Sequence, residues 1–359
     1  MLTLPAGGHR GAWAALDAFL REHRSLRTVG WLGYDLALDV EAWPTRIAED
    51  FAVPVLHVAA YRRVREFAPQ AVPPAPPVAA ATELRAHLPR AAYEQKVAAV
   101  VEHIRAGDIF QGNLTQPFTA AWQGDPRQLF WRLCEQSPAP FAAYVEDGSG
   151  VAVLSSSPEE FLRCDGDEVR TRPIKGTRRR AADPAADRRM LDELLASEKD
   201  VAELAMIVDL LRNDLGKVAR VGSVAVGPFP EHASFAQVHH LYATVTAKLR
   251  AEVSPVDLLR ATFPGGSITG CPKLRCLEIL ETLEVARRGV YTGAIGWFGP
   301  GPAMHLNIAI RTMVHRDGRL RMNAGGGVTA LSDPAAEWEE TLHKLAGLER
   351  AIGASATVS

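Results

Sequence analysis

The sequence predicts a mixed fold in which β-hairpins alternate with amphipathic α-helices. Its 359 residues exceed one ordinary hydrophobic core, which favours two domains or one large two-layer domain. Apolar residues recur with a helical period in several segments, which predicts helices that pack on a core. Elsewhere they alternate with polar residues around short Asp-Gly turns, which predicts antiparallel strand pairs. Hydrophobic residues make up 47% and charged residues 23% of the chain, as is ordinary for a globular protein.

The composition argues against several classes of protein. The net charge is -2, so no overall basic field would attract nucleic acid or an anionic membrane surface. The longest apolar runs are short and interrupted, so we expect no membrane span. The first residues lack a basic segment followed by an apolar one, and the four cysteines are widely scattered. We therefore expect a cytoplasmic protein with reduced thiols that binds neither nucleic acid nor membranes.

Three regions are expected along the chain. Residues 1–68 form an N-terminal, strand-rich part, because TVGWLGYDLALDVE and VPVLHVAAYRRVREF are typical of short strands with turns. Residues 69–90 form a Pro-rich linker or surface loop, since five of the residues from 69 to 77 are prolines. Residues 91–353 form the main domain. It opens with a helix at about 90–107, where a valine stripe precedes Gly107 as the stop.

The first hairpin is expected around Asp165-Gly166-Asp167, between AVLSSSPEEFLRC and EVRTRPIKG. If these strands pair about that turn, Glu159 lies nearly opposite Ile174, with a register uncertainty of one or two residues. Lys175 and Glu159 are then expected to lie close together. Taken alone, the lysine in the basic run TRPIKGTRRR has a simpler interpretation as a solvated surface charge.

The second hairpin is expected around Asp317-Gly318, between HLNIAIRTMVHR and RLRMNAGGG. Strand alternation places His305, Asn307 and Arg311 together on the polar face of its first strand. An arginine there, beside a Gly-Gly-Gly turn rich in free N–H groups, suits carboxylate binding. A solvated outer face is the alternative.

Two predicted helices carry glutamates. SEKDVAELAMIVDLLRNDLG has a serine cap and an apolar stripe, with Glu203 at the edge of that stripe. DPAAEWEETLHKLAGLERAI begins with an Asp-Pro cap signature and places Glu337, Glu340 and Lys344 on one face. Such a carboxylate pair, with a third from another helix, can hold a Mg2+ ion that keeps several waters. Spacing alone leaves a solvated helix face as the alternative.

Ten runs resemble, in order, signatures of the chorismate-utilising enzymes, which include the large subunits of anthranilate and aminodeoxychorismate synthases and the isochorismate and salicylate synthases. The runs are IRAGDIFQGNLTQ (104–116), SSSPEEF (155–161), RPIKGT (172–177), AELAMIVDLLRNDLGKV (202–218), FAQVHHL (235–241), FPGGSITGCPK (263–273), GVYTGAIGW (289–297), LNIAIRTM (306–313), NAGGGV (323–328) and SDPAAEWEETLHK (332–344). The resemblance implies an α+β fold of two stacked, mostly antiparallel β-sheets with outer helices. The active site would lie in the cleft between the sheets.

The resemblance also implies functional residues. It assigns three glutamates to a Mg2+ site: Glu203, Glu337 and Glu340. It assigns a further set to binding of chorismate, a dianion whose carboxylates must be neutralised: Arg311, Tyr291, Thr269, Gly270, Gly325, Gly326, Gly327 and Lys344. His240 matches an active-site histidine, with a structural histidine as the alternative, and His239 is expected to be structural.

Three positions discriminate within the family. Gln111 stands where isochorismate and salicylate synthases carry a lysine that activates water, and glutamine cannot act as a base. Lys175 stands where anthranilate synthases carry alanine, and both this lysine and FPGGSITG are typical of aminodeoxychorismate synthases. A Leu-Leu-Glu-Ser run, typical of tryptophan feedback in anthranilate synthases, is not found.

The implied reaction makes Lys175 a covalent nucleophile. In the resembling enzymes the lysine amine attacks ring C2 while the C4 hydroxyl leaves, and ammonia then adds at C4 and expels the lysine. The amine must be neutral, and we expect burial together with Arg172 and Arg178 to favour that form. Glu159 matches the general acid that protonates the leaving hydroxyl, which requires a raised pKa.

The resemblance implies a partner as well. Ammonia would come from a separate glutaminase subunit, because no G-x-C-x-G nucleophile turn is found in the chain. The N-terminal part is shorter than in typical large subunits of the family. The implied product, 4-amino-4-deoxychorismate, leads to 4-aminobenzoate and folate. The alternatives are an anthranilate synthase or dual-purpose relative, and a non-catalytic chorismate-binding subunit.

Overall fold

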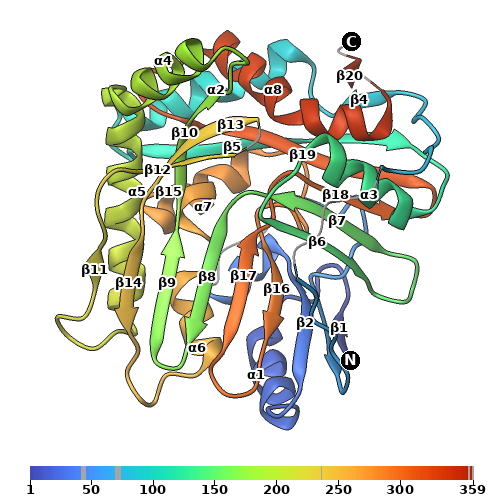
Figure 1. The fold of residues 1–359 in the computed structure, drawn as a ribbon, viewed down its shortest axis with the longest axis vertical. Helices are drawn as coiled ribbons and strands as arrows, with labels where there is room; N and C mark the ends of the chain where they lie inside the picture. Colours follow the sequence, from blue (N-terminus) through green and yellow to red (C-terminus); the bar gives the residue numbers. More distant parts are fainter. Residues whose placement is uncertain (42–45, 69–73, 236, 355, 358–359) are drawn as a thin grey trace.

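The fold is built from two large β-sheets with helices packed outside them. The computed structural model describes residues 1–41, 46–68, 74–235, 237–354 and 356–357. Figure 1 shows the sheets as two layers, the strands of one running across those of the other. Every strand pairing in the described part of the chain is antiparallel except that of β20 with β4. This is the α+β architecture of stacked, mostly antiparallel sheets that the sequence predicted.

The strands fall into three sheets in the described part of the chain. The nine-stranded sheet has the order β1 (Leu2–Leu4), β3 (Leu56–Tyr61), β2 (Arg27–Leu32), β16 (Ala294–Phe298), β17 (Met304–Ile308), β8 (Glu160–Asp165), β9 (Glu168–Arg172), β14 (Val245–Lys248) and β11 (Ala225–Val226). The second large sheet has the order β20 (Ala356–Thr357), β4 (Leu84–Ala86), β5 (Gln111–Ala121), β19 (Arg319–Val328), β18 (Thr312–Arg316), β7 (Ala152–Ser157) and β6 (Phe141–Glu146), with β15 (Gly270–Cys271) also paired to β5. The small sheet has the order β10 (Ile174–Arg179), β13 (Val238–Tyr242) and β12 (Glu231–Ser234).

The helices cover the outer faces of the sheets. They are α1 (Ala12–Glu22), α2 (Arg90–Arg105), α3 (Pro126–Gln136), α4 (Pro184–Leu195), α5 (Glu198–Gly216), α6 (Pro255–Thr262), α7 (Lys273–Leu283) and α8 (Pro334–Ile352), with 3-10 helices η1 (Tyr34–Asp39) and η2 (Gly266–Ile268). Figure 1 places α2 and α8 above the second large sheet, α4 above β10 of the small sheet, and α1 and α6 along the nine-stranded sheet. Side chains of α3 and α8 share a core cluster with β5, β7 and β19.

Apolar side chains fill the space between the two large sheets. Trp31 and Ile295 of the nine-stranded sheet share a buried cluster with Val153 and Val314 of the second sheet. Burying an aliphatic side chain of this size stabilises the fold by about 1.5–3 kcal/mol, so this cluster helps to fix one sheet against the other.

Three helices form where the sequence predicted them. The α2 helix covers Arg90–Arg105, and Gly107 follows with a φ of 80°. At the start of α5, the Ser197 side chain accepts a hydrogen bond from the amide of Asp200. The Asp333 side chain caps α8 in the same way, accepting from the amide of Ala336. These caps satisfy amides that the first helical turn leaves unpaired.

The first predicted hairpin forms, but its strands are shorter than predicted. β8 pairs with β9, Glu160 opposite Arg172, across the loop Gly166-Asp167. The run AVLSSSPEEFLRC divides between β7 in one large sheet and β8 in the other. EVRTRPIKG likewise divides between β9 and β10 of the small sheet. Glu159 and Lys175 therefore lie where the chain passes from one sheet to another.

The second hairpin shows the same pattern. β18 and β19 pair around Asp317-Gly318 as predicted. HLNIAIRTMVHR is not one strand, because β17 belongs to the nine-stranded sheet and β18 to the other, and Arg311 between them has a φ of 49°. The predicted alternation therefore ends before Arg311.

The predicted Gly-Gly-Gly turn is also wrong. Gly325–Gly327 lie inside β19, where they pair with β5. The β18 ladder covers only Arg319–Met322, so the glycine run has a pairing strand on the β5 side alone in the described chain. In such an antiparallel pair, amides alternately face the partner and face away from it. Part of the run can therefore still donate to a ligand.

The N-terminal region differs from the prediction in detail. Residues 1–68 contribute β1, β2 and β3 to the nine-stranded sheet, but they also form α1, and GYDLALDVE forms η1 where a strand was predicted. Within the predicted linker, residues 84–86 form β4, and Leu84 is fully buried. The end of that segment is thus part of a sheet, because pairing with β5 buries its apolar side chain. Residues 69–73 lie outside the described residues.

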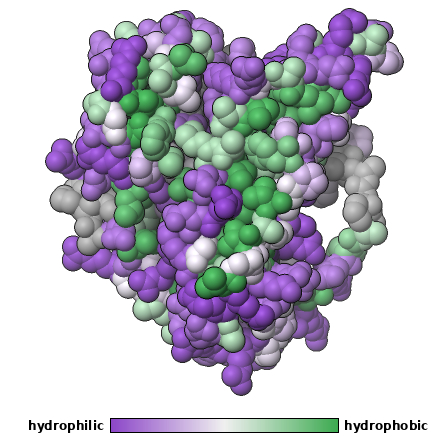
Figure 2. Space-filling model, turned by 90° about the vertical axis from the view of Figure 1, so that its left-hand side faces the viewer, coloured by the Kyte–Doolittle hydropathy of each residue, from purple (hydrophilic) through white to green (hydrophobic). Residues whose placement is uncertain are grey.

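The outer surface is largely hydrophilic on the face drawn in Figure 2, where hydrophobic residues gather in the central part between hydrophilic margins. Among the described residues, no helix is both long enough and apolar enough to cross a membrane.

Candidate active site

Lys175 lies on β10, and its amine points toward the loop that contains η2. Its Nζ donates a hydrogen bond to the carbonyl of Ser267 at 3.2 Å. Burial is the main cause that lowers the pKa of this amine, and the charge of Lys344 lowers it further. Glu203, Glu159 and Glu340 oppose that shift. The amine is thus held in a desolvated place, near carboxylates, with a larger neutral fraction than an ordinary lysine has.

The predicted role of two neighbouring arginines is wrong. The guanidinium of Arg172 lies over the ring of Tyr242, 4.3 Å from its centroid. Arg178 pairs with Asp200 at 3.1 Å. Neither is among the main causes of the lowered pKa of Lys175, which are burial and the charge of Lys344.

Glu159 lies in the link between β7 and β8 and is buried, with 4% of its surface exposed. The Ser267 hydroxyl donates to its Oε1 at 2.5 Å. Burial raises the pKa of Glu159 to about 7, although the Ser267 hydrogen bond and the charge of Lys175 act against that shift. Near neutral pH the carboxyl therefore keeps a protonated population that can donate a proton. Ser267 contacts both Lys175 and Glu159.

A group of glutamates lies next to the glycine run of β19. A Cβ atom on Gly326 would lie 2.7 Å from Oε2 of Glu337 and 3.6 Å from Oε1 of Glu340. The Oε1 of Glu337 accepts from the Ser332 hydroxyl at 2.6 Å, while its Oε2 is buried and has no hydrogen-bond partner among the described residues. Lys344 pairs with Glu340 at 2.7 Å and donates to the carbonyl of Gly325 at 2.9 Å.

Glu203 approaches this group from α5. Burial raises the pKa of its carboxyl, and Lys175, Lys199 and Glu340 are among the charges that act on it. In the described residues no three His, Cys, Asp or Glu side chains form a group able to hold a metal ion alone. Mg2+ commonly takes only one or two protein carboxylates and keeps its remaining ligands as water or substrate oxygen. The unpaired, buried oxygen of Glu337 beside Glu340 fits that kind of donor set.

Gln111 of β5 lies beside Lys175. A Cβ on Gly327 would overlap Nε2 of Gln111 and would lie 3.5 Å from Nζ of Lys175. Gln111 is buried, and its Oε1 has no hydrogen-bond partner in the described part of the chain. Gly327 thus provides the space in which these two side chains meet.

His240 lies on β13, and Arg311 lies between β17 and β18. His240 Nδ1 is 2.8 Å from the Thr177 hydroxyl, and its buried Nε2 has no partner among the described residues. Burial, assisted by the charge of Arg311, lowers the pKa of His240 to about 4, so its ring is neutral at neutral pH. Burial is the only cause that shifts the pKa of Arg311, and it lowers it; no carboxylate of the described residues acts on this guanidinium, which leaves it available to an anionic ligand.

His239 has a structural environment. Its Nδ1 lies 2.7 Å from the Ser234 hydroxyl, and its Nε2 lies 3.0 Å from Asp187. Both ring nitrogens are thus occupied within the fold.

The remaining predicted residues are Thr269, Gly270 and Tyr291. The hydroxyl of Thr269 donates to the carbonyl of Gly265 at 2.9 Å, and Gly270 has a φ of 132° where β15 meets β5. Tyr291 is buried and lines a cavity of about 160 Å3 with Thr312 and Asn323. Lys175, Glu159 and the glutamate group do not line that cavity.

The comparisons with known proteins identify the family. The sequence matches the chorismate binding enzyme family over residues 7–350, and the chain belongs to that family. It is therefore an enzyme of the chorismate-utilising kind.

The relatives of this chain are named for more than one activity. It is 42% identical over 339 residues to aminodeoxychorismate synthase component 1 of Klebsiella aerogenes, covering 88% of this chain and 75% of the relative. It is 37% identical over 396 residues to an anthranilate synthase component 1 of Haloarcula marismortui, covering 95% of this chain and 81% of the relative. Among solved structures, anthranilate synthase component I from Streptococcus pneumoniae superposes with a TM-score of 0.78 at 29% identity, covering 90% of this chain and 80% of that one.

Proposed function

We propose that the protein converts chorismate and ammonia to 4-amino-4-deoxychorismate through a covalent bond to Lys175. The observation that carries this proposal is the placement of the Lys175 amine and the Glu159 carboxyl on the two polar groups of Ser267. One is a desolvated amine with a lowered pKa, and the other is a carboxyl with a raised pKa. A nucleophile and an acid are the two groups that the reaction needs.

In the first step, the lone pair of the neutral Lys175 amine forms a bond to ring C2. The two ring double bonds shift, the C4–O bond breaks, and Glu159 gives its proton to the departing hydroxyl, which leaves as water. The proton lost by the attacking nitrogen restores the Glu159 acid. In the second step, ammonia forms a bond to C4, the double bonds shift back, and the C2–N bond to Lys175 breaks with return of a proton to the amine.

The other residues bind and orient the substrate. Arg311 and the outward amides of Gly325 and Gly327 would receive the substrate carboxylates. Glu203, Glu337 and Glu340 would hold Mg2+, which supplies charge neutralisation at the ring carboxylate. Neutral His240 can offer a hydrogen bond from its unpaired Nε2.

The alternatives to this reaction are weaker in this chain. Gln111 occupies the place beside Lys175 and cannot take a proton from water, which argues against isochorismate formation. The relatives include anthranilate synthases, but Lys175 stands where the resemblance gives those enzymes an alanine.

Ammonia would reach the site from a glutaminase that is a separate chain. The Klebsiella aerogenes relative is named a component 1, in keeping with such an arrangement. The product would be the precursor of 4-aminobenzoate.

Product identification tests the proposal. The purified protein, incubated with chorismate, Mg2+ and an ammonium salt, is expected to give 4-amino-4-deoxychorismate by liquid chromatography and mass spectrometry. An added aminodeoxychorismate lyase should turn this product into 4-aminobenzoate. Fluorescent anthranilate with pyruvate as the main product would contradict the proposal. Chorismate that is bound but left unchanged would point to a non-catalytic subunit.

A further inference from the structure

A buried ion pair lies next to the loop that contains Ser267. Arg288 and Glu284 belong to the segment after α7, and only 1% and 5% of their side chains are exposed. Nη2 of Arg288 lies 2.7 Å from Oε1 of Glu284, and Nε lies 2.9 Å from Oε2. The guanidinium also lies over the ring of Tyr34, 4.3 Å from its centroid. Burying two charges is costly unless other hydrogen bonds compensate, so the partners of this pair are informative.

Those partners lie on two separate segments. Arg288 donates to the carbonyl of Ile268 at 2.9 Å and to the carbonyl of Asn113 at 2.6 Å. Oε1 of Glu284 accepts from the amide and hydroxyl of Thr115, at 3.0 and 2.9 Å. The pair thus ties the loop 266–270, which contains η2, to β5.

The loop held in this way is the one that contacts both reacting groups. Ile268 directly follows Ser267, whose carbonyl accepts from Lys175 and whose hydroxyl donates to Glu159. A carbonyl fixed at position 268 restricts the peptide that carries the Ser267 carbonyl. A shift of Arg288 would therefore move Ser267 relative to both groups.

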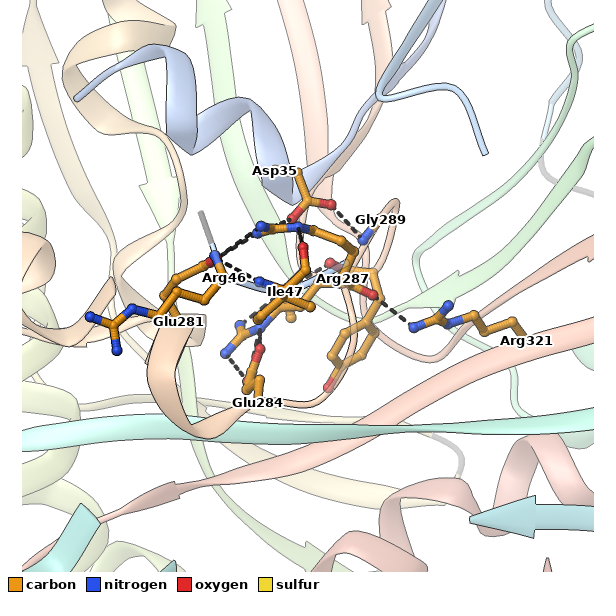
Figure 3. A network of polar contacts seen from close by, with 11 residues as sticks. Asp35, Arg46, Ile47, Glu281, Glu284, Arg287, Gly289 and Arg321 are labelled. Atoms are coloured by element: carbon orange, nitrogen blue, oxygen red, sulfur yellow. Dashed lines mark hydrogen bonds and ion pairs between the residues drawn. The ribbon is translucent and has the colours of Figure 1, made fainter. Parts of the chain in front are cut away.

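The neighbouring arginine provides a comparison. Arg287 also pairs with a partly buried glutamate, Glu281, at 2.8 and 2.9 Å, and the exposed fraction is 9% for each side chain. Its Nε donates to the carbonyl of Ile47, away from the loop. Figure 3 shows Arg287 between Glu281, Ile47 and Asp35, with Glu284 at the other side of the network. Two adjacent arginine–glutamate pairs thus hold different segments.

We propose that Arg288, oriented by Glu284, is a positioning residue that holds Ser267 between Lys175 and Glu159. This inference rests on the proposed function, because it assigns the two groups the roles of nucleophile and acid. Among the described residues, neither Arg288 nor Glu284 forms a hydrogen bond or ion pair with Lys175 or Glu159. They contribute by fixing the relative positions of the Lys175 amine and the Glu159 carboxyl.

Arg288→Lys tests the proposal, because a lysine keeps the charge but cannot hold two carbonyls and a carboxylate in one plane. We expect kcat to fall by about 100-fold, with a small change in KM for chorismate, since misplacement of reacting groups by about 1 Å has that effect. The basic limb of the pH profile should move to higher pH. The Ser267 hydrogen bond lowers the pKa of Glu159, so its loss raises that pKa.

Arg287→Lys is the matched control. It should lower thermal stability to a similar extent while leaving kcat and the pH profile close to wild type. An Arg288→Lys enzyme with wild-type kcat and pH profile would overturn the proposal. So would an Arg287→Lys enzyme with the same loss of kcat, because the effect would then be general destabilisation.

Ser267→Ala keeps the test decisive if Arg288→Lys does not fold. It should move the basic limb in the same direction, and an unmoved limb would overturn the proposal. Where both single variants fold, the basic limb of the double variant should shift by less than the sum of the two single shifts. Both changes remove the same hydrogen bond, that of the Ser267 hydroxyl to Glu159. All rates are followed as chorismate consumed, so these comparisons remain separate from the identity of the product, which tests the proposed function.

Discussion

Lys175→Ala is expected to reduce formation of 4-amino-4-deoxychorismate by 1,000-fold or more, on the order of the loss when a covalent nucleophile is removed. Without the amine no bond forms at C2, and the two-step exchange at C4 has no first step. Ammonia then has access to C2, so a small amount of anthranilate is the expected residual product. Chromatographic separation of products from chorismate and ammonium measures both.

Arg179→Ala is the control for this variant. Arg179 lies on the same strand and in the same basic run, but its side chain is exposed. It should retain wild-type product formation. Unchanged 4-amino-4-deoxychorismate formation by Lys175→Ala would refute covalent catalysis by this residue.

Glu159→Gln is expected to lower kcat by about 100- to 10,000-fold, the range for loss of a general acid. The amide keeps the size of the side chain but gives no proton to the leaving hydroxyl. In the wild type, activity should fall as pH rises through about 7, because Glu159 must be protonated and its pKa is raised to about 7. The residual activity of Glu159→Gln should not show this fall as pH rises. A variant with wild-type kcat would contradict the role of Glu159.

The same substitution should stabilise the fold at neutral and higher pH. The folded chain binds the Glu159 proton more tightly than the unfolded chain, in which the pKa is near 4.5. This contribution to stability is present below pH 4.5 and is lost as pH rises through about 7. Glutamine has no proton to lose, so the free energy of unfolding above pH 7 should increase by about 1–3 kcal/mol. Thermal denaturation of the wild type and of Glu159→Gln at pH 5 and pH 8 measures this difference in stability.

Much of the fold follows from local sequence signals. Helix caps such as Ser197 and Asp333 act within one helical turn, and the Asp-Gly turns fix hairpins between neighbouring segments. These signals predicted the position of α5 and α8 and the pairing of β8 with β9. The arrangement of the sheets came from the family resemblance, because sheet order depends on contacts between distant segments.

The strand breaks could not be predicted. The run through Glu159 forms a strand on each side of the point where it changes sheets, and so does the run through Arg311. Alternation reports that a residue lies in a strand but does not report which sheet the strand joins. These crossings are the places where Glu159, Lys175 and Arg311 lie.

The supporting residues were missed for a similar reason. Ser267 lies in a run that the resemblance quoted, but its contacts with Lys175 and Glu159 join positions about 90 and 108 residues away in sequence. No signal in the sequence distinguishes Arg288 and Glu284 from ordinary surface charges in a chain that is 23% charged. Only their burial shows otherwise. Burial was correctly expected to lower the pKa of Lys175, but the part assigned to Arg172 was wrong, because its guanidinium lies over the ring of Tyr242.

The most direct measurement is the intact mass of the protein after rapid quenching with chorismate and Mg2+ in the absence of ammonia. We expect a mass increase equal to chorismate minus one water, located by peptide mapping on Lys175 and absent from Lys175→Ala. Consumption of chorismate on addition of ammonium, with no such adduct on the wild-type protein at any quench time, would contradict the covalent route.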